Sequence, residues 1–169
     1  RTALQQLEDE GLITRVRGSG TALQGEEIII RNPYSIRPFQ HVLEPLAAYM
    51  QIAAAQAIEH EKAGYYNVGP EESDCVTVGT LASLFCKAWG DGLKWKNVCE
   101  DGPHEAKFLK LDCSHIKYAL DWKPCWDIRT AIEKTVEWTR VYAAHGDIRA
   151  CMETQINEFL EMTSEKGQM

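Results

Sequence analysis

Short apolar runs of β-strand character alternate with longer segments of helical periodicity along most of this chain. The β runs lie at 27–31, 65–68, 93–95 and 108–111, and the helical segments at 45–60, 77–90, 112–120, 127–143 and 147–162. Alternation of this kind is typical of α/β and α+β folds. The β runs are too few and too short for a doubly wound sheet with its own cofactor site. The sequence therefore predicts an α/β, α+β-like fragment without a complete Rossmann sheet.

Capping residues support these helix boundaries. Pro45 suits the first turn of a helix, where its missing N–H costs little. Thr77 and Asp127 can cap the helices that follow them, and Gly90 suits a helix end. The apolar faces expected on the four main helices are Leu46, Tyr49, Met50, Ala53 and Ala57; Leu81, Leu84, Phe85 and Ala88; Ile128, Ile132, Val136, Thr139 and Ala143; and Met152, Ile156 and Phe159.

Composition argues against several classes of protein. The net charge of −7 disfavours nucleic-acid binding by the whole chain, although it leaves room for a small basic patch. No apolar run reaches the roughly 18 residues of a membrane helix, and no secretory signal is visible at the start. The six cysteines form no C-x-x-C pair, and their scatter suits reduced thiols. We therefore expect a cytoplasmic protein with no metal site and no membrane contact.

Several sequence strings between about residues 24 and 160 are shared with one enzyme family. The most specific is Ile36-Arg37-Pro38-Phe39-Gln40-His41-Val42-Leu43-Glu44-Pro45-Leu46. Others are Ile30-Arg31-Asn32-Pro33, Tyr66-Asn67-Val68-Gly69-Pro70, Trp89-Gly90-Asp91-Gly92, Pro103-His104-Glu105-Ala106, Leu109-Lys110-Leu111-Asp112-Cys113-Ser114, Trp122-Lys123-Pro124 and Glu133-Lys134-Thr135-Val136-Glu137-Trp138. On these strings the chain resembles the CDP-glucose 4,6-dehydratases, within the NAD-dependent epimerase/dehydratase branch of the extended short-chain dehydrogenase/reductase (SDR) group.

This resemblance implies a lyase that converts CDP-glucose to CDP-4-keto-6-deoxyglucose for the dideoxysugars of surface polysaccharides such as O-antigen. Bound NAD is the transient hydride acceptor in that family. An N-terminal lobe holds NAD and a catalytic Tyr-x-x-x-Lys pair, a C-terminal lobe holds the nucleotide diphosphate, and full-length members commonly form homo-oligomers. On this resemblance, residues 23–169 are the C-terminal sugar-nucleotide-binding lobe.

Two catalytic motifs of the family are missing from the printed sequence. No G-x-x-G-x-x-G string follows a strand, and none of the six tyrosines has a Lys four positions later. Without such a Tyr, no group is in place to move the O4 proton of the sugar during hydride transfer. We therefore expect this chain alone to bind no NAD, to bind CDP-glucose or CDP weakly, and to have no turnover. The first residue is not Met, which suggests an interior piece of a longer chain.

Arg37 is the best candidate for holding the diphosphate, because it matches the Arg of the family's R-x-x-x-H-V element. Guanidinium groups bind phosphate through two parallel hydrogen bonds. The alternative is a structural Arg paired to Glu44 or to another carboxylate. Arg31 could approach the ligand with Asn32 as a helper, or it could simply be a solvated surface residue.

His104 and Glu105 match a segment that the family places near the nucleotide. Glu105 could accept from ribose hydroxyls and His104 could stack or hydrogen-bond, or the two could brace the loop. His41 is expected to be a satisfied core histidine, and the five tryptophans are expected to pack in the core. The family has Gly where Asp121 ends a helix here, so Asp121 should adopt left-handed backbone geometry at a mild cost.

Residues 1–22 have a different character from the rest. An amphipathic segment, a short strand and the turn Gly18-Ser19-Gly20-Thr21 resemble the end of a GntR-type winged helix. In that resemblance Arg1 and Thr2 face DNA, while Arg15 and Arg17 flank a wing that contacts phosphates. Three explanations stay open: a truncated or chimeric reading frame, a GntR-type transcriptional regulator with a sugar-nucleotide-sensing domain, and coincidence. The functional alternatives are therefore a DNA-binding regulator and a globular domain with no independent role.

Overall fold

The computed structural model describes residues 27–98 and 107–165, which fall into two compact units. The first unit contains the described residues up to Arg37 together with Val76–Leu109. The second contains Pro38–Cys75 and the residues from Lys110 onward. Each unit is therefore built from two separate stretches of chain. The predicted change of character near residue 22 lies outside the described residues.

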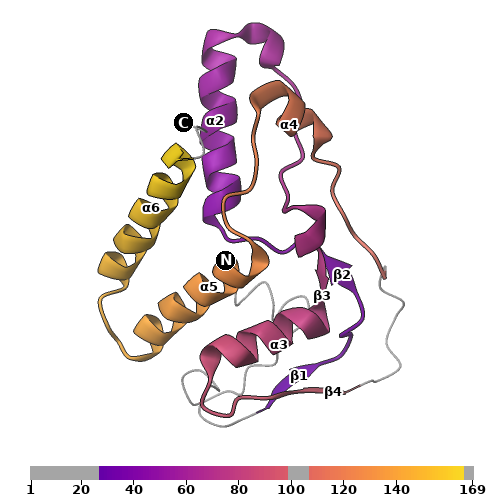
Figure 1. Ribbon diagram of the computed structural model, residues 1–169, viewed down its shortest axis with the longest axis vertical. Coiled ribbons are helices and arrows are strands. Elements are labelled where there is room, and N and C mark those ends of the chain that lie inside the picture. The colour runs from indigo at the N-terminus through magenta and orange to yellow at the C-terminus, as the bar shows by residue number, and fades with distance from the viewer. Residues whose placement is uncertain (1–26, 99–106, 166–169) are drawn as a thin grey trace. The chain divides into compact units, whose positions relative to one another are not determined.

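The first unit combines one helix with short strands (Figure 1). Its elements are β1 (Ile28–Ile30), β2 (Ile36–Arg37), β3 (Val76–Thr77), α3 (Val78–Trp89) and β4 (Trp95–Asn97). β1 pairs with β4 in parallel, and β2 pairs with β3 antiparallel. An isolated parallel bridge joins Ile36 to Phe108. The predicted mixture of helices and small sheets is confirmed, although the strand expected at 93–95 is shifted to β4 and that expected at 108–111 is reduced to the single bridge.

Helix α3 begins and ends where its sequence predicts. The Thr80 N–H donates to Thr77 Oγ1 at 3.0 Å, which caps the first turn. Gly90 ends the helix with a φ of 72°, a conformation that a residue without Cβ adopts easily. The fully buried side of α3 is formed by Val78, Gly79, Ala82 and Trp89, whereas the predicted stripe of Leu81, Leu84, Phe85 and Ala88 is half-buried.

The second unit is helical. Its elements are α2 (Leu43–Ile58), the 3-10 turns η1 (His60–Lys62) and η2 (Glu72–Asp74), α4 (Ser114–Leu120), α5 (Ile128–Ala143) and α6 (Ile148–Glu165). Asp127 caps α5 by accepting from the Thr130 N–H at 2.8 Å, as predicted. Asp121 ends α4 in the left-handed region, with φ 48° and ψ 27°, as its replacement of Gly requires.

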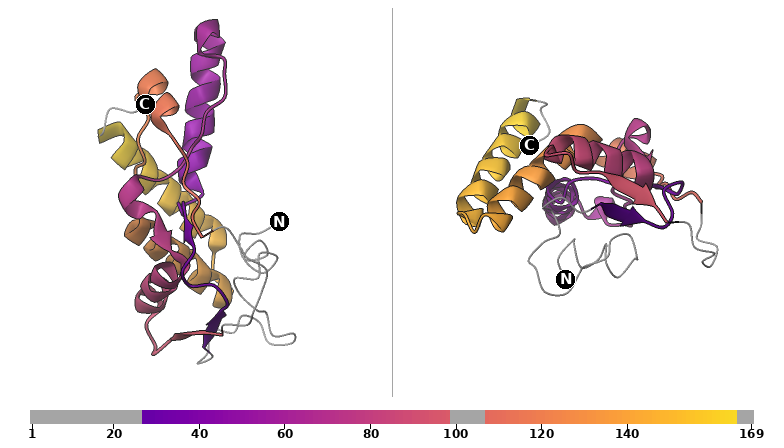
Figure 2. Two further views of the ribbon diagram at one scale, coloured as in Figure 1. Left: turned by 90° about the vertical axis from the view of Figure 1, so that its right-hand side faces the viewer. Right: turned by 90° about the horizontal axis from the view of Figure 1, so that it is seen from below.

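Helices α5 and α6 are joined by a short loop at 144–147 (Figures 1 and 2). Side chains on both helices bind one another: Gln155 Nε2 donates to the Lys134 carbonyl at 2.9 Å, and Lys134 forms an ion pair with Glu158. On the buried face of α5, Ile128, Ile132, Val136 and Thr139 are inside as predicted, but Ala143 is exposed. α6 buries Gln155, Phe159 and Thr163, so the expectation of an inward Met152 and Ile156 was wrong.

Two apolar clusters form the core of the second unit. One joins Ala48, Cys113, Ile116 and Trp122, with Ile52, Tyr66, Val68 and Leu120 packed against it. The other joins Cys125, Trp126 and Phe159, with Leu43 and Ala47 packed against it. α2 contributes residues to both clusters. The expectation of core tryptophans is met by Trp89, Trp122 and Trp126, which are 4–6% exposed, while Trp95 and Trp138 are half-buried.

A buried carboxylate links the two stretches of chain that form the second unit. Glu44, in the first turn of α2, is 1% exposed. Its Oε1 accepts from the Trp126 N–H at 2.6 Å and from the Cys125 N–H at 2.9 Å, and its Oε2 also lies 3.0 Å from the Cys125 nitrogen. These backbone donors immediately precede the cap of α5, so Glu44 fixes the start of that helix against α2.

His41 is a core histidine, as predicted. It is 9% exposed, its Nδ1 accepts from the Leu43 N–H at 3.3 Å, and its ring meets Trp126 edge-on at 4.8 Å. Burial, with a smaller contribution from the positive charge of Lys134, lowers the pKa of His41 from 6.5 to about 4. His41 is therefore neutral at physiological pH.

The apolar face expected on α2 was identified correctly as apolar, but it is not buried. Leu46, Tyr49 and Met50 are 48%, 59% and 65% exposed, and Ala53 and Ala57 are also exposed. The helix instead buries the opposite side, with Glu44 and Ala48. The strand expected at Tyr65–Val68 is also absent, since this segment pairs with no strand among the described residues.

The described cysteines are free thiols: Cys75, Cys86, Cys113, Cys125 and Cys151. Burial raises the pKa of Cys75, Cys86, Cys113 and Cys151, which makes a poor nucleophile of each thiol. Within the described ranges, every helix is too short or too polar to cross a membrane.

Replacing Glu44 by Gln should lower the free energy of unfolding by about 3 kcal/mol, because an amide presents one acceptor oxygen where two carboxylate oxygens now meet buried N–H groups. Urea denaturation at pH 7 measures the change. Glu133→Gln, at an exposed acid on α5, is the matched control and should leave the urea midpoint unchanged. Equal effects of the two substitutions would contradict the proposed role of Glu44.

The low pKa of His41 predicts a stability that is present above about pH 6.5 and is lost as the pH falls toward 4. Because the unfolded chain takes up this proton near pH 6.5 and the folded chain near pH 4, His41 alone should remove about 2 kcal/mol between pH 7 and pH 5. His41→Asn keeps an acceptor for the Leu43 N–H and should flatten this pH dependence in urea denaturation. The exposed His145→Asn should leave it as in the parent chain.

Candidate functional site

Three of the predicted substrate-binding residues lie on the first unit, around the turn between β1 and β2. Arg31 follows β1 directly and is exposed. Asn32 is half-buried, and its Oδ1 accepts from the Tyr34 N–H at 3.3 Å. Ser35 Oγ donates to the Asn32 carbonyl at 3.4 Å. Asn32 therefore stabilises the turn through its side chain. Its predicted role as a helper in ligand binding stays a prediction.

The start of α3 holds this turn in place. The Gly79 N–H donates to the Pro33 carbonyl at 2.9 Å, and the Val78 N–H donates to the Ser35 carbonyl at 3.0 Å. A Cβ at Gly79 would lie 3.1 Å from Pro33 Cβ and 3.2 Å from the Pro33 oxygen. A side chain at this position would crowd Pro33, so glycine favours this close approach of the helix to the turn. The turn that carries Arg31 and Asn32 is thus fixed by helix packing.

Arg37 ends β2 and is half-buried. It lies opposite Val76 in the antiparallel pair, and its Nη1 donates to the Ile36 carbonyl at 2.9 Å. This short bond directs one edge of the guanidinium along its own strand. The expected contact with a diphosphate stays a prediction. The alternative pairing of Arg37 with Glu44 would join the two units and also stays a prediction.

Lys107 is a cation near β2 that belongs to none of the sequence strings shared with the family. The Ile36 N–H donates to the Lys107 carbonyl at 3.1 Å, and the Leu109 N–H donates to the Ile36 carbonyl at 3.1 Å. These bonds hold the backbone of 107–109 beside the strand that ends at Arg37. The pairing spans about seventy residues of sequence, so no local pattern near Lys107 points to it.

Positive charge predominates over the described part of the first unit. Six cationic side chains belong to it, against the two acids Glu27 and Asp91: Arg31, Arg37, Lys87, Lys94, Lys96 and Lys107. Lys96 is paired with Glu27 at 2.8 Å. Over the whole unit, residues 1–37 and 76–109, nine Lys and Arg residues stand against nine Asp and Glu residues, so the excess is confined to the described part. The described cationic side chains can attract phosphorylated ligands locally.

The remaining predicted site residues lie outside the described residues. They are His104 and Glu105 in the expected nucleotide-contacting segment, and Arg1, Thr2, Arg15 and Arg17 in the winged-helix resemblance. Their roles stay predictions. In the described ranges no group of three or more His, Cys, Asp or Glu side chains is arranged to hold a metal ion.

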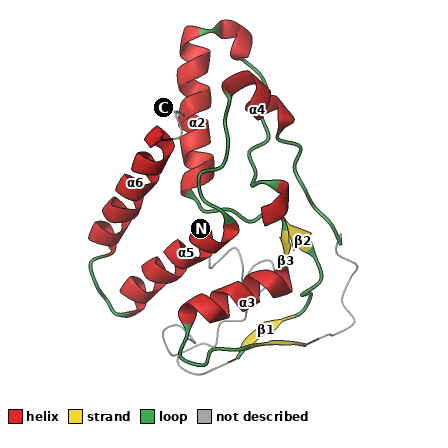
Figure 3. Cartoon of the chain, viewed as in Figure 1, coloured by secondary structure: helices red, strands yellow, loops and turns green. Residues whose placement is uncertain are grey.

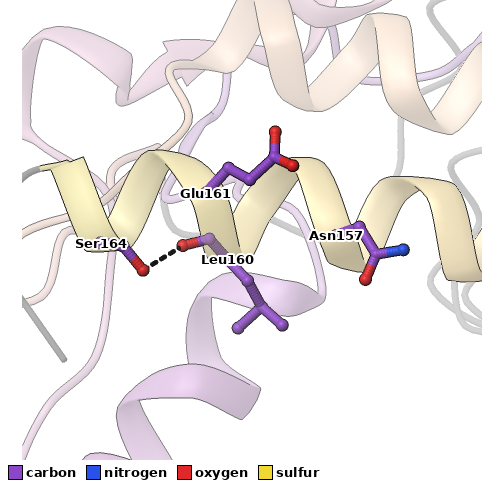
Figure 4. A pocket seen from close by; sticks show the side chains of 4 residues that line it. All are labelled: Asn157, Leu160, Glu161 and Ser164. Atoms are coloured by element: carbon purple, nitrogen blue, oxygen red, sulfur yellow. Dashed lines mark hydrogen bonds between the residues drawn. The ribbon is translucent and has the colours of Figure 1, made fainter.

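A shallow hollow on α6 offers no chemistry of its own. It is lined by Asn157, Leu160, Glu161 and Ser164, all of which are exposed and lie on one helix (Figure 4). Ser164 Oγ donates to the Leu160 carbonyl at 2.8 Å, so its hydroxyl hydrogen is already engaged within the helix. The hollow is a depression between neighbouring surface side chains.

Comparison with known proteins links the chain to one enzyme. No family model matches it. The chain is 38% identical over 142 residues to a CDP-glucose 4,6-dehydratase of Salmonella typhimurium. The match covers 82% of this chain and 39% of the length of that enzyme. The predicted resemblance to this enzyme class is confirmed, and the winged-helix resemblance stays a prediction. The chain is therefore similar over most of its own length to a CDP-glucose 4,6-dehydratase, of which it spans well under half.

Proposed function

We propose that this chain is the C-terminal sugar-nucleotide-binding lobe of a CDP-glucose 4,6-dehydratase, that it binds CDP or CDP-glucose weakly, and that it has no turnover alone. The observation that carries the proposal is the 38% identity over 142 residues. Identity at this level over four-fifths of the chain supports a shared fold for the matched part.

Cationic side chains among the described residues of the first unit suit a nucleotide diphosphate. Arg37 is the leading phosphate contact, because the guanidinium fork matches two phosphate oxygens at once. Arg31 directly follows β1, and Lys107 lies on the segment that is hydrogen-bonded to β2. Both residues add positive charge near these strands. Binding through so few contacts is weak, since each charged hydrogen bond contributes about 1.5–3 kcal/mol.

The described strands do not fit a dinucleotide cofactor. β1 is followed by 31–35, a turn that contains Pro33 and no glycine, whereas a pyrophosphate-binding turn needs glycines for the close approach of backbone to phosphate. The printed sequence also has no Tyr-x-x-x-Lys pair. We therefore derive no hydride-transfer step for this chain. In the proposed enzyme that step belongs to an NAD-binding lobe in the same or another polypeptide.

Titration calorimetry with CDP tests the binding proposal. The parent chain should bind CDP with a dissociation constant near the millimolar range, and Arg37→Ala should weaken binding about tenfold or more through loss of a charge-assisted contact. Arg129→Ala removes the same charge from an exposed position on α5 in the other unit and should leave the affinity unchanged.

Two results would contradict the proposal. Absence of CDP binding by the parent chain, or an Arg37→Ala variant that binds as the parent does, removes the assigned phosphate site. Formation of the 4-keto sugar nucleotide from CDP-glucose and NAD by the chain alone removes the claim that it has no turnover.

A further inference from the structure

The outward side of α6 carries an apolar ridge. Met152, Ile156 and Leu160 recur every four residues and are 48%, 39% and 38% exposed, whereas another side of the helix buries Phe159. Figure 3 shows α6 as one uninterrupted helix after the loop at 144–147. Residues four apart lie one above another on a helix, so the three apolar side chains form a continuous line. A line of apolar side chains that faces water indicates an interaction surface.

The hollow on α6 is a groove beside this ridge. A second row of residues four apart, Glu153, Asn157 and Glu161, runs next to it. The hollow is lined by Asn157 and Glu161 from this row and by Leu160 and Ser164 from the ridge (Figure 4). In the commonest class of helix packing, the rows of residues four apart on one helix fit into the grooves between such rows on the other. α6 therefore presents both halves of such a contact, a ridge and a groove.

The one cation of α6 lies at the end of the helix that disfavours it. Arg149 is the only basic residue between Ile148 and Glu165, and it lies in the first turn, where the helix dipole is positive. Its Nε donates to Glu153 Oε1 at 2.8 Å, but a cation placed before the acid is the weaker order for such a pair. The Arg149 side chain is 89% exposed. A carboxylate from a second molecule would compensate this local cost, and Glu161, exposed on the same row about three turns later, supplies one.

We propose that two copies of this chain associate through α6, with the two helices antiparallel about a twofold axis at Ile156. Ile156 then meets its counterpart, and Met152 meets Leu160 of the partner subunit, so that each ridge enters the groove of the other helix. The same arrangement brings Arg149 toward Glu161 of the partner subunit, twice in each dimer. The contact uses none of the residues proposed to bind CDP.

Charge selects both the partner and the direction of this contact. A parallel pair of α6 helices would place Arg149 beside Arg149 and Glu161 beside Glu161, which like-charge repulsion opposes. The exposed apolar side of α2 is a poorer partner for α6, because α2 has no charged residue after Glu44 to meet Arg149 or Glu161. A contact between α6 and α2 would also be heterologous and leave both surfaces open for further copies, whereas the α6 pair is closed.

Sedimentation equilibrium of the full chain tests the apolar part of the contact. The chain should show a monomer–dimer equilibrium below about 1 mM and no larger species, since one helix from each copy forms a small interface. Ile156→Gln should weaken the dimer at least about tenfold, because this residue occurs twice at the centre. Leu46→Gln on α2, at 48% exposure, is the matched control and should change the dissociation constant less than about threefold. A melting curve of each sample checks that it is folded.

Charge reversal tests the antiparallel direction at two exposed positions where folding is not at risk. Arg149→Glu and Glu161→Arg should each weaken the dimer about fivefold or more at low salt, since each creates two like-charge contacts. An equimolar mixture of the two variants should form a heterodimer about as tight as the parent dimer, because both contacts then join opposite charges. Arg129→Glu on α5 is the control and should change the affinity less than about twofold.

Three results would overturn the proposal. The first is a chain that stays monomeric at about 1 mM. The second is a dimer that Leu46→Gln weakens as much as Ile156→Gln does, which would assign the contact to α2. The third is a mixture of the Arg149→Glu and Glu161→Arg variants that associates no more tightly than either variant alone. Absence of CDP binding by a chain that dimerises in this way contradicts only the proposed function.

Discussion

The second unit depends on the hydrogen bonds of one buried carboxylate. Glu44 holds the backbone N–H groups of Cys125 and Trp126, which are more than eighty residues away along the chain. A carboxylate out of water is tolerated only when strong donors satisfy it, and here two N–H groups converge on it. The contact sets Trp126 in place for His41 and Phe159, whose rings pack against it at 4.8 and 5.1 Å. It also fixes the point from which Asp127 starts α5.

Local chemistry allowed much of the fold to be predicted from the sequence. Thr77 and Asp127 cap helices because hydroxyl and carboxylate oxygens reach the first-turn N–H groups, and Asp121 ends α4 in the left-handed region. Periodicity identified the apolar faces of α2 and α6 but not which side each helix buries. That choice is made by distant residues, and for α2 it is made by a carboxylate that a hydropathy pattern counts as surface.

The residues of the candidate site that lie on one continuous stretch of chain could be predicted from the sequence. Arg31, Asn32 and Arg37 lie within seven residues and fall on one turn and its flanking strands. Lys107 was missed because its place beside β2 follows from a hydrogen-bonded pairing with Ile36 across the sequence.

The polar anchor also explains why an apolar face can stay exposed. A helix held only by hydrophobic contacts could rotate about its axis to bury Leu46 and Met50 and so satisfy the hydrophobic effect within its own unit. For α2 that rotation would carry Glu44 away from the Cys125 and Trp126 N–H groups and leave buried donors unpaired, which costs about 1–3 kcal/mol for each group. Ala48, at 0% exposure, would have to give way to a larger side chain as well. The buried carboxylate thus fixes the rotation of α2, and with it the exposure of Leu46 and Met50.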